Sequence, residues 1–268
     1  LLNYMDRQML STMKSAMQID IVELESATNF GRLMAVFLWI YGLMSPISGI
    51  IADRMNRKWL IVGSLFVWSA VTSLMGEAET FQQIYWLRAL MGVSEALYIP
   101  AGLSLIADYH TGKSRSLAVG IHMTGLYTGQ AIGGFGATVA AAFTWNTTFH
   151  WFGIIGIVYA FLLMLFLKDK KSSFAEHPKG SATVPKEKKS LFKGLSMLFS
   201  NLSFWIILLY FAAPSLPGWA TKNWLPTLFA DSLNIPMSQA GPIATITIAL
   251  SSFIGVIAGG ILSDKWVQ

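Results

Sequence analysis

Residues 116–167 read SLAVGIHMTGLYTGQAIGGFGATVAAAFTWNTTFHWFGIIGIVYAFLLMLFL, which is 52 positions without a Lys, Arg, Asp or Glu. A helix needs ~20 apolar residues to cross the hydrocarbon core of a bilayer, so this stretch fits two spans rather than one. We expect the turn between them at residues 145–148, Trp-Asn-Thr-Thr. The stretch therefore predicts a helical membrane protein whose spans follow one another closely.

The composition of the whole chain favours the same class. Charged residues make up 12% of its 268 positions and hydrophobic residues make up 54%. Because soluble domains carry about 25% charged residues, these values disfavour a soluble fold and exclude a disordered or coiled-coil chain. There is no cysteine, and there is no phosphate-binding loop, metal-spaced cluster or serine nucleophile motif. We therefore predict no metal site, no cofactor and no enzymatic activity.

The runs with few or no charges predict eight spans in total. Lys and Arg gather in the loops after the second, fourth, sixth and eighth of them. Because basic loops stay on the cytoplasmic side, we expect a multi-pass protein of the cell membrane with a cytoplasmic N-terminus. In a Gram-negative cell this is the inner membrane. The predicted spans are residues 1–18, 32–52, 59–77, 83–107, 116–143, 149–168, 203–229 and 240–262.

A repeated motif divides the chain into two parts. The letters GIIADR at residues 49–54 end the second span, and GILSDK at residues 260–265 end the eighth. Similar motifs at corresponding places, 211 residues apart, indicate internal duplication. A polar, Lys-rich segment between the parts is expected to be a flexible cytoplasmic linker. The predicted domains are a six-helix bundle at 1–167, the linker at 168–202, and two helices of an incomplete second bundle at 203–268.

These features resemble the major facilitator superfamily. The loop after the second span resembles its signature loop, with Asn56 where the family often has Gly, and the fifth span resembles its glycine-rich fifth helix. Glycines every fourth residue of that span allow close helix approach. The resemblance implies the all-α major facilitator fold, with one six-helix bundle and the first two helices of the other. Since that family has twelve helices, we expect this chain, which begins with Leu1, to be a fragment.

Three motifs resemble one branch of that superfamily, the anion:cation symporters. They are NYMDR at residues 3–7, RALMGVSE at 88–95 followed by Pro100, and NWLPT at 223–227. The nearest likeness is to hexuronate and galactonate proton symporters. The resemblance implies that the Asp-Arg pair of the first span and the Glu of the fourth serve proton coupling and substrate binding. Those roles fall on Asp6, Arg7 and Glu95.

Arg7 is the predicted centre of substrate binding. Its planar guanidinium offers a fork of donors that matches a carboxylate or a phosphate. Asn3 lies four residues earlier on the same helical face and can hold a neighbouring hydroxyl. The alternative is that Arg7 only neutralises Asp6 or Glu95, or that it lies at the membrane surface. The complete predicted set of substrate-binding residues is Arg7, Asn3, Tyr4, His122, Tyr127 and Gln130.

Glu95 is the predicted carrier of the coupled proton. Ionisable groups inside a bilayer are costly, and a low-dielectric environment favours the neutral form of a carboxyl group. Arg88 lies two helical turns from Glu95 on the same face, about 10 Å along the axis. The alternative is a purely structural ion pair between Glu95 and Arg88. Asp6 completes the predicted proton-coupling set.

A conformational gate is predicted at the cytoplasmic helix ends. Charged groups there can pair in one conformational state only and so shift the balance between states. The alternative is that these arginines only set the topology. The predicted gate residues are Gly49, Asp53, Arg54, Arg57 and Asp264.

The leading functional hypothesis is proton-coupled symport of an organic anion, such as a hexuronate or aldonate, by alternating access. One alternative is an organic-phosphate antiporter, for which Lys222 is a poorly placed second cation. The other is a membrane sensor that binds without transport. We expect the partners to be the anion, protons and the lipid bilayer, with no nucleic acid, and we expect a monomer. Lys14 and Lys222 are expected to extend to the outer headgroups. The alternative is that they make the cavity more cationic, which favours a multiply charged or larger acidic substrate.

Overall fold

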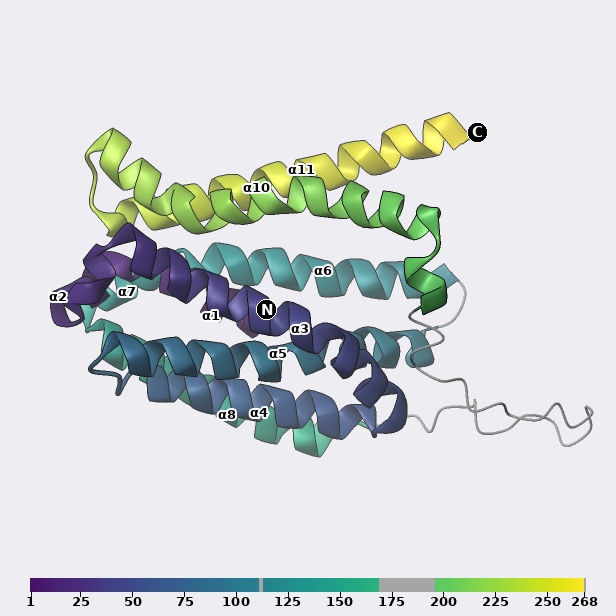
Figure 1. The fold of residues 1–268 in the computed structure, drawn as a ribbon, viewed down its shortest axis with the longest axis horizontal. Coiled ribbons are helices and arrows are strands. Elements are labelled where there is room, and N and C mark those ends of the chain that lie inside the picture. Colours follow the sequence, from purple (N-terminus) through teal and green to yellow (C-terminus); the bar gives the residue numbers. More distant parts are fainter. Residues whose placement is uncertain (111–112, 169–195, 268) are drawn as a thin grey trace, which may run out of the picture. The chain divides into compact units, whose positions relative to one another are not determined.

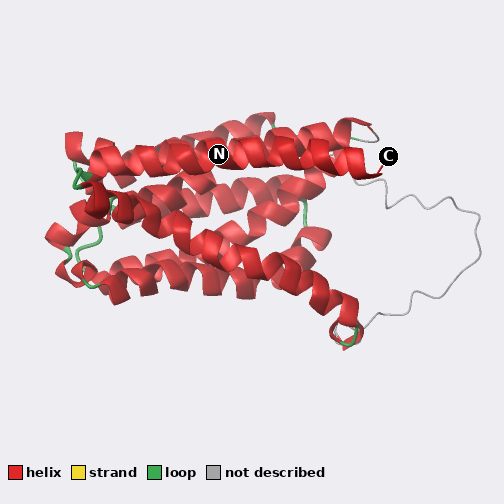
Figure 2. Ribbon diagram, turned by 90° about the horizontal axis from the view of Figure 1, so that it is seen from above, coloured by secondary structure: helices red, strands yellow, loops and turns green. Residues whose placement is uncertain are grey.

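The computed structural model describes residues 1–110, 113–168 and 196–267, without the side chains of Asp53, Lys113, Ser116 and residues 256–267. These described residues form helices and short connections, with no strand among them (Figure 2). The predicted all-α class is therefore confirmed. In chain order the elements are α1 (Leu2–Thr12), α2 (Lys14–Asp20), the 3-10 helix η1 (Val22–Glu25), α3 (Ala27–Arg54), α4 (Arg57–Met75), α5 (Phe81–Tyr109), α6 (Lys113–Gly133), α7 (Gly136–Ala142), α8 (Trp145–Phe166), α10 (Leu202–Leu233) and α11 (Met237–Val267).

Six of the described helices are long and apolar enough to cross a membrane, namely α3, α4, α5, α8, α10 and the Met237–Gly255 part of α11. They correspond to six of the eight predicted spans. The predicted spans 1–18 and 116–143 are helical as well, but each is divided. Met13 separates α1 from α2, and residues 134–135 separate α6 from α7. These two divided segments also carry many polar residues, which lowers their apolar character below that of the other six.

The predicted turn at residues 145–148 is wrong in position. Helix α8 begins at Trp145, and Thr144 is its N-cap. The Thr144 hydroxyl accepts a hydrogen bond from the backbone N–H of Thr147 at 3.0 Å. A threonine that satisfies one of the free N–H groups at a helix start favours a start at the next residue. The turn therefore lies just before residue 145.

The contacts between helices place α4 against both α5 and α8, and α3 against α5 (Figure 1). Helix α1 packs on α6, and α11 packs on α6 and α7. Gly129 and Gly133 of α6 lie directly against Leu1 and Met5 of α1, where a Cβ atom would meet backbone atoms. Small residues with this spacing let two helix backbones approach closely. The structure thus uses the glycine spacing of the sequence to seat α1.

By its contacts the chain divides into two units, which are described separately. Residues 1–170 and 223–268 form the first unit, and residues 171–222 form the second. Most of the predicted linker, residues 169–195, lies outside the described residues. The predicted domain boundaries at 1–167, 168–202 and 203–268 stay a prediction.

Candidate functional site

Two predicted functional residues form an ion pair where α1 and α5 meet. Arg7 Nε of α1 donates to Glu95 Oε2 of α5 at 2.7 Å. The Glu95 side chain is fully buried, whereas 20% of the Arg7 side chain is exposed. The sequence left open whether Arg7 pairs with Asp6 or Glu95 and whether Arg88 pairs with Glu95, and the structure has Arg7 with Glu95. Within the described chain Arg88 forms no ion pair with Glu95.

Aromatic rings surround the Arg7 guanidinium. Its Cζ atom lies 4.5 Å from the centroid of the Phe37 ring, 4.9 Å from that of Tyr41 and 5.0 Å from that of Tyr4. Arg88 Cζ also lies 4.5 Å from the Phe37 centroid, so both arginines contact the same ring. Such cation–π contacts strengthen when they are removed from water. Phe37 of α3 therefore helps to hold two predicted functional cations in place.

Sequence reasoning missed Phe37. Phe37 lies one helical turn before Tyr41 in α3. An aromatic pair at this spacing shares one helix face, and this was the available signal. It is a weak signal, because aromatic residues are frequent in apolar helices and the chain has 17 Phe. Only the packing of α3 against α5 brings the ring to the charges.

Asp6 lies near the ion pair of Arg7 and Glu95, on another side of α1. It is buried, and its Oδ2 atom accepts a hydrogen bond from the hydroxyl of Thr72 on α4 at 3.5 Å. It also lies close enough to Glu95 and Arg88 to interact with their charges. Successive residues of a helix point in different directions, so Asp6 turns to α4 while Arg7 turns to α3 and α5. We call Asp6, Arg7, Arg88 and Glu95 the charged cluster.

The charged cluster contains hydrogen-bond donors that have no acceptor. Arg7 Nη2 and Arg88 Nε are buried, and neither has a hydrogen-bond partner in the described part of the chain. Arg88 Nη1 donates to the sulfur of Met91 at 3.1 Å, and a thioether is a weak acceptor. Buried polar groups are normally hydrogen-bonded, so each exception requires an explanation. Unused guanidinium donors of this kind can bind an oxyanion.

The other predicted substrate-binding residues divide into two groups. Asn3 and Tyr4 belong with the charged cluster, since Asn3 is buried beside Glu95 and the Tyr4 ring contacts Arg7. His122, Tyr127 and Gln130 all lie on α6. No hydrogen bond or ion pair among the described residues links these three to Arg7 or Glu95. Their roles in substrate binding stay a prediction.

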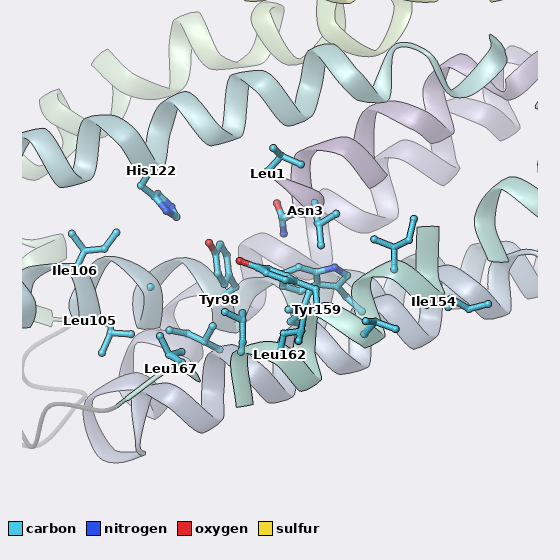
Figure 3. A pocket seen from close by; sticks show the side chains of 18 of the residues that line it. Leu1, Asn3, Tyr98, Leu105, Ile106, His122, Ile154, Tyr159, Leu162 and Leu167 are labelled. Carbon is cyan, nitrogen blue, oxygen red and sulfur yellow. The ribbon is translucent and has the colours of Figure 1, made fainter. Parts of the chain in front are cut away.

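A cavity of about 710 Å³ lies between the start of α1 and helices α4, α5, α6 and α8 (Figure 3). Its lining is mainly apolar, with Asn3, Tyr98, His122 and Tyr159 among the polar members. Arg7 and Glu95 do not line it. A site for a small anion needs charged or hydrogen-bonding groups, and this lining supplies few. The charged cluster is therefore the candidate centre of substrate binding, and the cavity adjoins it through Asn3, which lines the cavity and lies beside Glu95.

The predicted gate residue Arg57 forms an ion pair with an acidic residue. This pair lies at the end of the first unit that is away from α2 (Figure 1). Arg57 at the start of α4 forms an ion pair with Asp108 near the end of α5, and its Nη1 donates to the Ser104 carbonyl oxygen at 3.4 Å. Sequence reasoning missed Asp108, whose signal was its position at the end of a long apolar helix. Arg54 is exposed, and Gly49 lies in α3 with open space around its Cα. The side chains of Asp53 and Asp264 lie outside the described residues, so the gate stays a prediction.

Lys14 and Lys222 were both expected to extend to the outer headgroups, and the structure describes contacts for Lys14. Lys14 of α2 contacts aromatic rings, because its Nζ atom lies 5.3 Å from the Phe30 centroid and 5.7 Å from the Trp224 centroid. The expected position of this ammonium at the outer headgroups stays a prediction. Lys222 belongs to the second unit, and its role stays a prediction.

The fold and the charged cluster define a helical membrane protein with a buried, charged centre. The sequence matches the Major Facilitator Superfamily over residues 1–268, and the chain belongs to this family. This finding confirms the family resemblance and the expectation of a membrane-spanning all-α fold. The family and the named relatives below are transporters, which also confirms that this chain is not an enzyme.

Curated relatives of this chain carry transporter names. It is 28% identical over 272 residues to the hexuronate transporter of Bacillus subtilis, covering 98% of this chain and 61% of that protein. It is 25% identical over 274 residues to the probable L-galactonate transporter of Escherichia coli K12, covering 100% and 60%. It is 27% identical over 284 residues to the sphingosine-1-phosphate transporter SPNS2 of Xenopus tropicalis, covering 100% and 53%. The chain thus spans between 53% and 61% of these relatives.

A solved structure shares the fold. The crystal structure of a bacterial homologue of the human lysosomal transporter Spinster, inward-facing and unoccupied, superposes with a TM-score of 0.78. The two sequences are 24% identical, and the match covers 99% of this chain and 60% of that one. At this identity the likeness establishes the fold alone.

Proposed function

We propose that this protein transports an organic anion, such as a hexuronate or aldonate, together with protons. The observation that carries the proposal is the buried ion pair between Arg7 and Glu95, in which Arg7 keeps an unused donor at Nη2. A guanidinium is the natural partner of a substrate carboxylate, and a buried carboxyl group is a natural proton carrier. The hexuronate and L-galactonate names of two relatives agree with this substrate class.

The charges of the cluster suggest how the proton and the anion are linked. With both carboxyl groups ionised, the two acidic and two basic side chains of the charged cluster sum to zero. A proton on Glu95 leaves one positive charge and releases the Nε donor of Arg7 from its ion pair. A substrate carboxylate can then take the place of Glu95 at Arg7 and restore neutrality. Each ligand therefore favours the binding of the other, and the coupling is reciprocal.

The same exchange of Glu95 and the substrate carboxylate at Arg7 also explains how the anion is released. When Glu95 loses its proton, its carboxylate competes with the substrate for Arg7 and weakens substrate binding. If the site faces alternate sides of the membrane by rocking of two helical bundles, this competition releases the anion on the side where the proton leaves. The cytoplasmic N-terminus, the monomeric state and the gate are further parts of the proposal. The gate residues are Gly49, Asp53, Arg54, Arg57 and Asp264.

The test is proton uptake by proteoliposomes that hold the protein and an internal pH dye. A hexuronate, an aldonate and a sugar phosphate are added outside in separate runs. The proposal expects internal acidification with a sugar acid and none with protein-free vesicles. No acidification with any sugar acid, together with exchange of a labelled sugar phosphate, would replace symport with antiport. Binding of a sugar acid without any flux would indicate a sensor instead.

The SPNS2 relatives supply a second candidate substrate class, an amphipathic phosphate. The same guanidinium donors suit a phosphate, so the chemistry of Arg7 does not decide between the classes. A fourth run with sphingosine-1-phosphate in the vesicle assay separates them. Flux of this lipid without flux of sugar acids would favour the second class.

A further inference from the structure

The early helices and the segment after residue 222 meet at one end of the first unit. The described contacts between them lie near α2 and α7 (Figure 1). The Thr138 hydroxyl donates to the carbonyl oxygen of Ser238 at 2.7 Å, and that of Thr245 donates to Ala131 at 3.3 Å. Beside them, the rings of Phe30 and Trp224 meet edge to face, with centroids 5.5 Å apart.

Lys14 contributes a positive charge to this contact. Its Nζ atom lies within cation–π distance of both rings, one from α3 and one from α10. In the described part of the chain Lys14 forms no ion pair with a carboxylate. A cation between helices needs compensation for its lost hydration, and here the ring faces supply it. We call Lys14, Phe30 and Trp224 the aromatic clamp.

We propose that the aromatic clamp holds the start of the segment after residue 222 against α2 and α3, and so keeps this end of the transport path closed. Lys14 is the positioning residue, because its ammonium contacts a ring from each side of the contact. With the predicted topology this end faces the outside of the cell. The inference goes beyond the proposed function, because such a seal acts whatever substrate the protein carries.

The neighbouring contacts explain why removal of the clamp can open this end. Gly241 lies against the backbone of Gly134 and the side chain of Thr12, so the helices meet through small residues. Small residues permit close approach but bury little apolar surface at the point of contact. The clamp residues add contacts between larger side chains at this end.

The test measures how fast a buried cysteine at this end becomes accessible. The chain has no cysteine, so a single introduced cysteine is the only thiol of this sequence. Ala244 on α11 is fully buried near the contact, and Ala101 on α5 is fully buried in a core cluster with Ala52 and Leu60 at the other end. Ala244→Cys thus reports opening of this end, and Ala101→Cys reports loosening of the fold. Both are labelled with a membrane-impermeant maleimide in lipid nanodiscs.

Lys14→Gln removes the cation and keeps a polar side chain of similar length. The proposal expects Ala244→Cys to be labelled about five-fold faster in this variant, given the usual strength of a partly desolvated cation–π contact. Lys14→Arg keeps a cation that stacks on aromatic faces and should restore the slow rate. Trp224→Leu, which removes one ring from the clamp, should reproduce the fast rate of Lys14→Gln.

Arg32→Gln is the matched control. Arg32 is an exposed cation of α3, two residues from Phe30, without a described cation–π contact. Its loss should leave the labelling of Ala244→Cys unchanged. The proposal is overturned if Lys14→Gln labels Ala244→Cys at the parent rate. It is also overturned if labelling of Ala101→Cys rises in parallel, because Lys14 would then support the whole fold rather than one end.

Discussion

The ion pair between Arg7 and Glu95 is the feature through which proton and anion binding can be linked. A 2.7 Å contact between a guanidinium and a fully buried carboxylate is broken only if another group replaces the lost charge. A proton can do this for Glu95, and a substrate carboxylate can do it for Arg7. The surrounding rings and the unused Nη2 donor suit this exchange, because they hold the guanidinium without occupying all of its donors.

Arg7→Lys tests whether the fork of donors matters beyond its charge. Lysine keeps the positive charge but loses the planar pair of donors and the stacking on Phe37. We expect the affinity for a sugar acid to fall at least tenfold, which corresponds to about 1.4 kcal/mol. Isothermal titration of the protein in detergent with a hexuronate measures it. Arg32→Lys, an exposed site on α3, is the control, and an unchanged affinity in Arg7→Lys would exclude Arg7 from substrate binding.

Phe37→Leu tests the ring that both arginines share. Leucine keeps an apolar side chain but has no ring face, so Arg7 and Arg88 each lose a cation–π contact of about 0.5–2 kcal/mol. We expect weaker anion binding and an altered pH dependence of uptake, whereas Phe37→Tyr should retain both. Uptake measured across a pH series gives the comparison. A uniform loss of folded protein, with normal affinity in the remainder, would assign Phe37 a packing role only.

At the scale of elements, close packing of α1 on α6 sets the position of Arg7. Gly133 faces the backbone of Met5 and the side chain of Gln8, with no space for a Cβ atom. Gly133→Ala should therefore lower stability by about 1–3 kcal/mol through overpacking, although alanine favours a helix. Thermal unfolding in detergent measures the change. Gly120→Ala in the same helix meets no atom within 4 Å, so it should be neutral or slightly stabilising, and equal effects at both sites would refute the packing argument.

The sequence predicted the helices and the buried charges well, because both depend on local information. Long uncharged runs mark spans, and a charge inside such a run is conspicuous, as Arg88 and Glu95 show. The partner of Glu95 was not predictable in this way, since it depends on which helices lie side by side. Arg88 shares a helix face with Glu95, yet Arg7 from a different helix forms the ion pair.

The pattern of uncharged runs also did not predict where α8 begins or where α1 ends. Hydropathy counts residues over about 20 positions and does not detect a single capping threonine, so the start of α8 after Thr144 was placed late. For the same reason it did not separate α1 from α2 at Met13. The ring contacts of Lys14 were also beyond it, because nothing in the segment of Lys14 indicates that Phe30 and Trp224 meet beside it.

At the scale of the whole molecule, the described residues place a charged cluster between α1, α3 and α5, an aromatic clamp at one end and an ion pair of Arg57 with Asp108 at the other. A transporter that alternates between two open states requires a central site and separate closures at its two ends. The charged cluster is the proposed central site and the aromatic clamp is the proposed closure at one end. The pair of Arg57 and Asp108 joins two neighbouring helices, so the closure at the other end stays a prediction. The central claim concerns the middle group, because coupling depends on proton exchange at Glu95.

Glu95→Gln gives the most direct test of that claim. Glutamine resembles a protonated glutamate in shape but cannot release a proton, so the site should bind the anion without coupling it to a proton gradient. Proteoliposomes with this variant and an imposed inward proton gradient should show no uphill uptake of a hexuronate, while exchange of labelled for unlabelled hexuronate continues. Uphill uptake at the parent rate in Glu95→Gln would contradict the account, because the coupled proton would then be carried by another group.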